Sequence, residues 1–387
     1  MSGVKVLVSG ASIAGPALAH WLQRRGAEVT VVEQAPGLRP GGQAVDARGV
    51  AKEVIRRMGL DEAIRAVCTD TKGGYSVDAD GNVLETFRAD DNDGDGYVSE
   101  IEVLRGDFAQ VLYDDTRERV EYLFGDRIVE IAQDADGVDV VLASGLRRRF
   151  DLVIGADGLH SSLRAMVFGP REQYVRHLGM VLAFFTVPNE FGIDGWLLDH
   201  QAEGRWAGLR PVPDKERAIA MLSFPAPAFT IDHRDITAQK QLLREQMAGF
   251  GWETPRILEH VDAAPDFYLD QVAQVVMERW YDGRVGLLGD AAFCASPMSG
   301  GGTGLALVGA YVLAGELAAA DWDPAVAFPA YQERMRDYVE ANQEIGRAHV
   351  EMLLATPDAP APEPDMEAFG ALIDRAVNGP QLPDYAD

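Results

Sequence analysis

The sequence predicts an α/β fold in which one domain is interrupted by a β-rich insertion and followed by a long helix. Three observations predict it. Residues 4–33 read as strand, helix, strand, which is a βαβ opening. Residues 284–320 contain another buried strand and a long apolar helix. Residues 174–224 between them are mostly extended segments. Because related α/β elements stand at both ends of the chain, the domain they form is expected to be discontinuous.

The composition restricts the binding partners and the cellular compartment that we expect for this protein. The 387 residues include 35 Lys and Arg against 61 Asp and Glu, a net charge of −26. Such a surface repels nucleic acid and anionic lipid, so a phosphate-bearing ligand needs a local positive site. Cys68 and Cys294 lie far apart without metal-ligand spacing. We therefore expect a reduced, cytoplasmic protein without a metal site, a nucleic-acid partner or a membrane partner.

The N-terminal half divides into short elements with clear periodicity. Gly10 ends the first strand, and the DADG turn at 78–81 indicates a hairpin. Helices are predicted at 14–25, 49–58, 61–67 and 106–118, and strands at 4–10, 27–33, 73–78, 83–88 and 98–104. A run of strands then ends at Gly155, and a short helix starts near Ser161.

The C-terminal half is expected to alternate between the insertion and the first domain. Helices are predicted at 236–249, 254–261, 303–320, 324–355 and 366–377, extended segments at 267–279 and 284–290, and a Pro-rich linker at 356–364. Residues 291–315 carry no charge, but Pro297 and a glycine cluster favour a loop feeding a buried helix over a membrane span.

These elements give predicted domain boundaries. The discontinuous nucleotide-type domain is predicted at 1–72, 98–175 and 270–323. The inserted domain is predicted at 73–97 and 176–269, and the C-terminal helix and tail at 324–387.

The first motif is GASIAG at 10–15. Gly10 permits a tight turn after the strand, and Gly15 permits close helix–strand packing, as in Rossmann-like dinucleotide sites. Ser12 stands where a glycine is usual. Glu33 ends the second strand and can accept hydrogen bonds from ribose hydroxyls. The alternative is a structural βα turn without a ligand.

The second motif is GADGLHSSLR at 155–164. It leaves a buried strand, so Asp157 is expected at the carboxyl end of the sheet, where open α/β folds bind ligands. Ser161 can cap the following helix, and Arg164 lies three residues further on. The alternative is a turn followed by a cap. His160 is expected to be a turn histidine.

The third motif is GDAAFCASPMSGGGTG at 289–304. Asp290 follows a strand that ends in glycine, and Pro297 stiffens the loop. The glycines let backbone N–H groups approach a ligand just before a long helix, whose positive end favours an anionic ring system. The alternative is a glycine-rich helix lead-in.

The three motifs, in this order, resemble those of the class A FAD-dependent aromatic monooxygenases of the p-hydroxybenzoate hydroxylase type. The resemblance covers about residues 4–355 and implies a Rossmann-like FAD domain, a β-sheet-rich substrate domain, FAD as cofactor and NAD(P)H as co-substrate. Two departures are Ser12 for glycine and Phe293 for the usual histidine. The implied cofactor-binding residues are Gly10, Ser12, Ile13, Ala14, Gly15, Glu33, Gln34, Arg48, Arg105, Asp157, Arg164, Gly289, Asp290, Pro297, Gly300, Gly301, Gly302, Thr303 and Gly304.

The resemblance also assigns three arginines. Arg105, in EVLRGDF, stands where the family has an arginine contacting the FAD ribose or pyrophosphate. Arg48 lies where the family has residues near the flavin ring. Arg164 and its surroundings are where the resemblance places the nicotinamide contact.

The resemblance implies that the chemistry is carried by the flavin. NAD(P)H reduces FAD, dioxygen forms a flavin hydroperoxide, and a hydroxyl passes to an electron-rich ring, so no catalytic side chain is expected. The expected substrate pocket lies between the flavin and the insertion. The candidate walls are Phe184, Phe185, Trp196, Trp206, Arg210, Met221 and Phe224, of which Phe185, Trp196, Arg210, Met221 and Phe224 are the predicted substrate residues. Alternation does not tell which side of each strand faces the pocket. Arg210 could bind an acidic or enol-bearing substrate, or form a salt bridge on the outer face.

Several functions stay open. The compact length and the helix at 324–355 resemble the tetracycline-inactivating and antibiotic-tailoring flavin monooxygenases, which implies an aromatic or fused-ring polyketide substrate. A Baeyer–Villiger reaction and a non-catalytic flavin-binding protein are the alternatives. A halogenase is disfavoured because no WxWxIP segment is present. The expected assembly is a monomer or homodimer.

One segment suggests a different function. DNDGDGYVSEIE at 91–102 places acidic residues and a glycine at the positions of a calcium-binding loop. Such a loop needs a helix on each side, whereas both flanks here read as strands. We therefore expect an acidic connector.

Overall fold

Buried β-branched runs build a six-stranded sheet at the centre of the first domain. The computed structural model describes residues 3–385 except 97, 230 and 356–364. The strand order is β17(Tyr281–Asp282), β18(Val285–Leu287), β11(Leu152–Gly155), β1(Lys5–Ser9), β2(Glu28–Glu33), β7(Glu121–Phe124). All pairs are parallel except β17 with β18. The carboxyl ends of β1, β11 and β18 therefore meet at one edge, as the predicted Rossmann-like fold requires.

Helices cover this sheet and close its core. They are α1(Ala14–Arg24), α2(Val50–Met58), α3(Asp61–Arg65), α4(Arg105–Thr116), α5(Ser162–Val167), α8(Asp290–Phe293) and α9(Gly302–Ala319). Two small antiparallel sheets complete the domain: β8(Ile128–Gln133), β9(Val138–Leu142) and β10(Arg147–Phe150), and β3(Ala44–Asp46) with β6(Glu102–Leu104).

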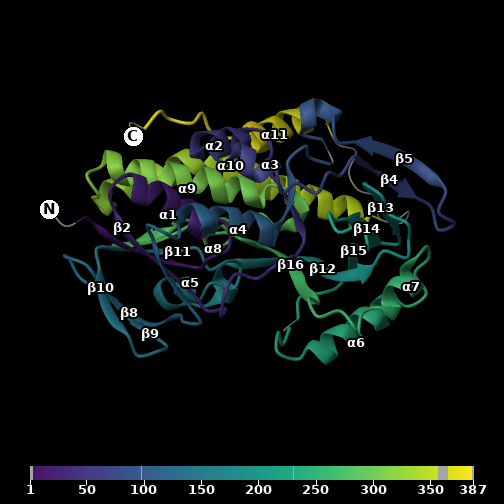
Figure 1. The fold of residues 1–387 in the computed structure, drawn as a ribbon, viewed down its shortest axis with the longest axis horizontal. Helices are drawn as coiled ribbons and strands as arrows, with labels where there is room; N and C mark the ends of the chain where they lie inside the picture. Colours follow the sequence, from purple (N-terminus) through teal and green to yellow (C-terminus); the bar gives the residue numbers. More distant parts are fainter. Residues whose placement is uncertain (1–2, 97, 230, 356–364, 386–387) are drawn as a thin grey trace.

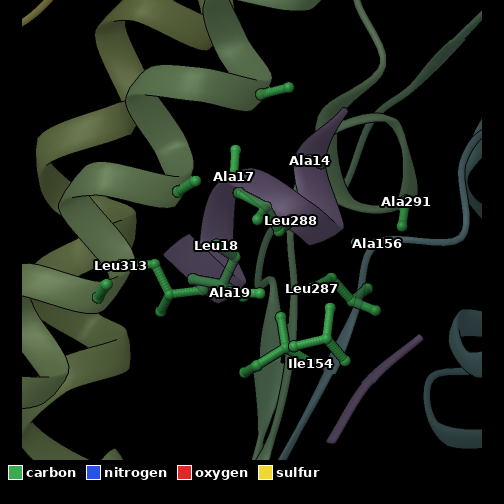
Figure 2. Close-up of a cluster of buried hydrophobic side chains, with 14 of the residues drawn as sticks. Ala14, Ala17, Leu18, Ala19, Ile154, Ala156, Leu287, Leu288, Ala291 and Leu313 are labelled. Carbon is green, nitrogen blue, oxygen red and sulfur yellow. The ribbon is translucent and has the colours of Figure 1, made fainter. Parts of the chain in front are cut away.

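Helix α9 is buried by α1, α2 and α10 rather than exposed. By length and composition alone it could cross a membrane, but 83% of it is buried inside the molecule. Figure 2 shows Ala17 and Leu18 of α1 beside Leu288 and Leu313, in the layer between the sheet and α9. The expected buried helix is confirmed.

The second sheet has seven strands, in the order β16(Tyr268–Val275), β12(Val175–Pro188), β15(Arg217–Pro225), β14(Arg205–Pro211), β13(Trp196–Ala202), β4(Gly73–Val77), β5(Val83–Arg88). Helices α6(Ile236–Met247) and α7(Thr254–Glu259) cover one face of it (Figure 1). The sheet thus unites two segments that are about 90 residues apart in the chain. Strand β16 extends past the boundary predicted at residue 269.

Helix α10(Pro324–Leu354) runs along the molecule and connects the two halves (Figure 1). The Asp323 carboxylate accepts from the Ala325 N–H at 2.9 Å and caps the helix start. Tyr331, Met335 and Tyr338 join the first core, while Val350 joins a cluster on the seven-stranded sheet. Helix α11(Met366–Asn378) packs back against α10. The predicted linker at 356–364 lies outside the described residues.

The calcium-like segment joins strand β5 to strand β6, as predicted, with a short 3₁₀ turn at Asp91–Gly94. Asp95 pairs with Lys52 at 2.9 Å and accepts from the Gly49 N–H at 3.2 Å. Glu102 points into the protein and pairs with Arg210. Two of the oxygen-ligand positions are therefore occupied by internal contacts, and the segment serves as a connector.

Candidate flavin site and substrate face

The turns after β1 and β11 are packed against each other. The Ala156 N–H donates to the Ser9 carbonyl at 2.7 Å, and the Leu288 N–H donates to the Gly155 carbonyl at 2.8 Å. A Cβ at Gly10, whose φ is +112°, would lie 2.4 Å from the Ala156 carbonyl oxygen. A Cβ at Gly15 would lie 1.9 Å from the Gly10 oxygen. The packing at this edge therefore requires both glycines, independent of any ligand.

A cavity opens beside the end of β2. Its volume is about 360 Å³, within the range of small-molecule sites. The Glu33 carboxylate is fixed by the backbone N–H groups of Ala11 at 2.9 Å and Ala35 at 2.8 Å, and each of its oxygens keeps a lone pair for a ribose hydroxyl. The lining comprises Glu33, Gln34, Ala35, Arg39, Gly125, Asp126, Arg127 and Ala143. This cavity fits the adenosine of a dinucleotide.

Arg105 brings a positive charge to the turn that follows β1. It is the first residue of α4, and its Nη1 donates to the Ser12 hydroxyl at 3.1 Å. Burial and the neighbouring Arg39 lower the pKa of Arg105. Within the described part of the chain, no carboxylate lies within ion-pair distance of Arg105. Such a half-buried cation, in a chain of net charge −26, is suited to a pyrophosphate, and Ser12 holds it in place.

The glycines of the third motif differ in what surrounds them. A Cβ at Gly301 would lie 1.7 Å from Asn342 Oδ1, so α10 packs directly against this backbone. A Cβ at Gly302 would meet nothing within 4 Å. Gly302 begins α9, so open space lies beside the first turn of an 18-residue helix. Its N–H groups and positive end are thus available to the anionic edge of a flavin ring.

The remaining predicted residues of the third motif lie along the same loop. Asp290 begins α8 and is exposed, Pro297 begins a 3₁₀ turn, and Gly300 adopts φ +65°. Arg48 Nη1 lies 3.4 Å from the Gly300 carbonyl, so the structure does place Arg48 beside the glycine loop. Phe293 is buried against Trp280 and takes part in the core.

The polar side chains of the second motif form hydrogen bonds within the protein itself. Asp157 accepts from the Ser162 N–H at 2.9 Å and the Leu163 N–H at 3.1 Å, and thereby caps α5. Arg164 is 1% exposed and donates to the carbonyls of Ala291 at 2.8 Å and Leu159 at 2.7 Å. The buried Arg164 guanidinium therefore links the backbone of the second motif to that of the third by hydrogen bonds. The Arg164 side chain itself is buried, and a nicotinamide contact at its surroundings stays a prediction.

Arg210 belongs to a buried network of charges. It pairs with Glu102 of β6, which is 2% exposed. Glu102 Oε1 also accepts from the hydroxyls of Thr69 and Thr71, each at 2.7 Å. Of the two roles left open for Arg210, a substrate anion and a salt bridge, the structure shows the salt bridge, although it lies inside the protein rather than on an outer face.

Strand pairing in the seven-stranded sheet determines which side chains point toward the flavin-site loops. Directly paired residues of antiparallel strands point to the same face. Phe184 pairs with Met221, which pairs with Gly208, and Ile219 pairs with Arg210. This face joins Leu104 and Met298, which flank the flavin-site loops. We call it the substrate face; its cluster contains Phe184, Trp206, Ile219, Met221, Leu104 and Met298.

Three of the predicted substrate residues lie on the opposite face. Phe185 and Phe224 are 1% exposed and pack with α6 and α7. Trp196 pairs with Gly73, and its position in the strand alternation places it on the face opposite the substrate face. Its ring stacks on that of Tyr75, with 4.6 Å between the ring centroids. Successive side chains of a strand point to opposite faces of the sheet. A wrong choice of face therefore selects residues that all point away from the substrate. Of the aromatic and apolar candidate walls, Phe184, Trp206 and Met221 lie on the substrate face.

Sequence reasoning missed Asp199. It lies on the substrate face opposite Gly208, is 7% exposed, and receives a hydrogen bond from the Trp206 side chain. Burial raises the pKa of Asp199 to about 6. Its Oδ2 has no hydrogen-bond partner among the described residues. The available signal was an acidic residue inside the apolar run WLLDH.

Comparison with known proteins identifies the family. A family model described as FAD binding domain matches residues 3–341. The uncharacterized protein Rv1260 of Mycobacterium tuberculosis is 47% identical over 341 residues, which cover 87% of this chain and 91% of that protein. A flavin-dependent monooxygenase of Legionella longbeachae is 38% identical over 391 residues, covering 99% of this chain and 98% of that one. The crystal structure of tetracycline destructase Tet(51) superposes with a TM-score of 0.86, at 37% identity, over 100% of both chains.

The glycine turns, the cavity beside Glu33, the cation at Arg105 and the open space at Gly302 all fit FAD. Together with the match of the family model over most of the chain, they show that this protein belongs to the FAD-binding family and is an FAD-dependent monooxygenase.

Proposed function

We propose that this monooxygenase uses NAD(P)H to oxygenate a flat, fused-ring aromatic molecule of the tetracycline or related polyketide type. The observation that carries the proposal is the substrate face. Phe184, Trp206 and Met221 pack in one apolar cluster with Leu104 and Met298, which adjoin the flavin-site loops. An apolar wall of this kind suits the face of a ring system.

The polar groups near this wall favour a neutral, oxygen-rich substrate over a simple acid. Arg210 and Glu102 cancel each other's charge, so the wall offers no net cation to a carboxylate. Asp199 Oδ2 is an acceptor that could take a hydrogen bond from a substrate hydroxyl or enol. The full-length likeness to tetracycline destructase Tet(51) supports the same substrate class.

The protein's own part in the reaction is to bind, orient and exclude water. When bound, FAD supplies the activation of dioxygen and the transfer of one oxygen atom. Glu33 and Arg105 would hold its adenosine and pyrophosphate, and the first turn of α9 would face the ring. The apolar side chains of the substrate face would keep water from the reacting ring.

The decisive test measures oxidation of NADH and of NADPH by the FAD-loaded enzyme, with tetracycline, other fused-ring polyketides and p-hydroxybenzoate added in turn. We expect a fused-ring compound to stimulate oxidation and yield a product heavier by one oxygen atom. Stimulation by the simple phenol alone would overturn the substrate class. No stimulation by any compound, with FAD bound, would favour a non-catalytic flavin-binding protein.

Product structure then distinguishes the reaction types, since ring hydroxylation and Baeyer–Villiger insertion both add one oxygen. We further propose a cytoplasmic enzyme, monomeric or homodimeric, without nucleic-acid or membrane partners. The net charge of −26 and the two free cysteines support this.

A further inference from the structure

Three side chains from separate parts of the chain meet at the edge of the seven-stranded sheet. His160 lies in the turn after β11, His233 precedes α6, and Asp270 lies on β16. His160 Nε2 is 2.5 Å from Asp270 Oδ2, and His233 Nε2 is 3.9 Å from Asp270 Oδ1. Their possible ligand atoms all lie within 4.8 Å of one another. His160 is thus more than the turn histidine that the sequence suggested.

Asp270 is held in position by neighbours that leave the two imidazoles accessible. Its side chain is 7% exposed, against 38% for His160 and 42% for His233. The Tyr268 hydroxyl donates to Oδ2 at 3.0 Å, and the Gln271 N–H donates to Oδ1 at 2.8 Å. A fixed carboxylate with such outer contacts and two accessible imidazoles is the arrangement of a metal site with open positions.

An ion pair accounts for the short contact of His160 with Asp270, whereas His233 lies at a longer distance from the same carboxylate. The two imidazole rings lie 4.7 Å apart, edge to face. Two protonated rings at this distance would repel each other, whereas two neutral rings can donate lone pairs to one cation. The pair of rings is therefore better suited to a metal ion than to two charges.

We propose that His160, His233 and Asp270 bind one late first-row divalent cation, with Zn²⁺ as the probe. Two imidazoles and one carboxylate form an established donor set for Zn²⁺, at bond lengths of about 2.0–2.2 Å. Tetrahedral bonds of this length separate neighbouring ligand atoms by about 3.3 Å. His160 Nε2 and Asp270 Oδ2 must move apart and His233 must approach, which small rotations of the exposed imidazoles supply.

The bound ion would tie the flavin side of the molecule to the substrate sheet. His160 belongs to the second motif, whereas Asp270 lies on the same strand as Tyr268, whose ring neighbours Phe184 of the substrate face. This proposal does not depend on the identity of the substrate or on turnover.

The test titrates Zn²⁺ into chelator-treated, FAD-loaded enzyme by calorimetry. We expect one equivalent to bind, and His233→Gln and Asp270→Asn each to weaken binding by at least roughly tenfold. His260→Gln is the matched control, because His260 also lies beside one carboxylate, Glu190 at 3.3 Å, but outside the cluster. Equal affinity in wild type and His233→Gln, or equal weakening by His260→Gln, would overturn the proposal.

Co²⁺ provides a second readout. In the wild type we expect visible bands of a tetrahedral ion without the strong charge-transfer band of a thiolate ligand. His233→Gln should abolish these bands, and Cys68→Ser should leave them unchanged, since Cys68 is the half-buried free thiol. Because His233 is exposed and precedes a helix, its variant also keeps the test valid if Asp270→Asn fails to fold. Loss of the bands on Cys68→Ser would place the ion elsewhere.

Discussion

At the residue scale, two buried charges, Glu102 and Arg210, form an ion pair between β6 and the seven-stranded sheet. Glu102 of β6 and Arg210 of β14 lie within a largely apolar junction, and Thr69 and Thr71 satisfy the second oxygen of Glu102. Removal of one member of such a pair leaves an uncompensated charge and costs about 3–5 kcal/mol. The role of Arg210 is thus in the junction, whereas Asp199 on the substrate face keeps an oxygen without a hydrogen-bond partner among the described residues.

Asp199→Asn should stabilise the protein, and more so at high pH. The pKa of Asp199 is raised from 3.8 to about 6, so the folded state holds the proton more tightly than the unfolded state. Stability therefore falls as pH rises from about 4 to about 6, by up to about 3 kcal/mol in all. Urea unfolding should show a larger gain for Asn at pH 8 than at pH 5, by about 1 kcal/mol. Asp194→Asn, exposed and paired with Lys215, is the control and should show no gain.

The adjacent phenylalanines Phe184 and Phe185 allow a matched test of the two sheet faces. Phe184→Leu should raise KM for the accepted substrate by roughly tenfold with little loss of stability. Phe185→Leu should lower the free energy of unfolding by about 1–2 kcal/mol and leave KM unchanged, because Phe185 packs with α6 and α7. Steady-state kinetics and urea unfolding provide the two measurements. A KM effect confined to Phe185→Leu would reverse the assignment of the faces.

At the element scale, the loop before α9 serves two partners at once. Gly301 is pressed against Asn342 of α10, while Gly302 faces open space at the start of α9. Packing against α10 requires glycine at 301, whereas no described atom of the protein requires it at 302. In the first motif, by contrast, packing alone requires both Gly10 and Gly15.

Gly301→Ala and Gly302→Ala should therefore separate folding from cofactor binding. The added methyl of Gly301→Ala would meet Asn342 Oδ1 and should lower the stability of the apoprotein by about 1–3 kcal/mol. Gly302→Ala should leave apoprotein stability unchanged and weaken FAD binding, measured by quenching of flavin fluorescence. Normal FAD affinity in Gly302→Ala would show that the flavin does not approach this turn.

At the scale of the whole molecule, the cofactor site is assembled from distant segments. The residues proposed to hold FAD lie in the turns after β1, β2 and β11, at the start of α4 and in the loop before α9. A ligand that binds only such an assembled site stabilises the folded state by mass action, by about 2.7 kcal/mol at a hundredfold excess over Kd. The stability of this protein is therefore expected to depend on its cofactor.

FAD should raise the melting temperature of the apoprotein far more than riboflavin does. Riboflavin lacks the pyrophosphate and adenosine that the Arg105 turn and the Glu33 cavity are suited to hold. Arg105→Ala should remove much of the FAD effect and leave the small riboflavin effect intact. Thermal unfolding with each ligand measures this. An equal shift by the two ligands would argue against the assignment of these two subsites.

The sequence by itself determined the features that depend on local periodicity and turn chemistry. The βαβ opening, the hairpin at 73–88, the buried helix at 303–320 and the long helix at 324–355 agree with the structure to within a few residues. The three glycine motifs predicted the cofactor family, because backbone approach and tight turns leave few residue choices.

Only the tertiary structure decided the direction of side chains and their distant partners. Strand alternation is symmetric, so residue order alone could not place Phe184 rather than Phe185 on the substrate face. Arg210 and Glu102 are separated by 108 positions, and His160 and Asp270 by 110. Contacts at such separations depend on how whole elements pack, and the sequence around each residue carries no record of them.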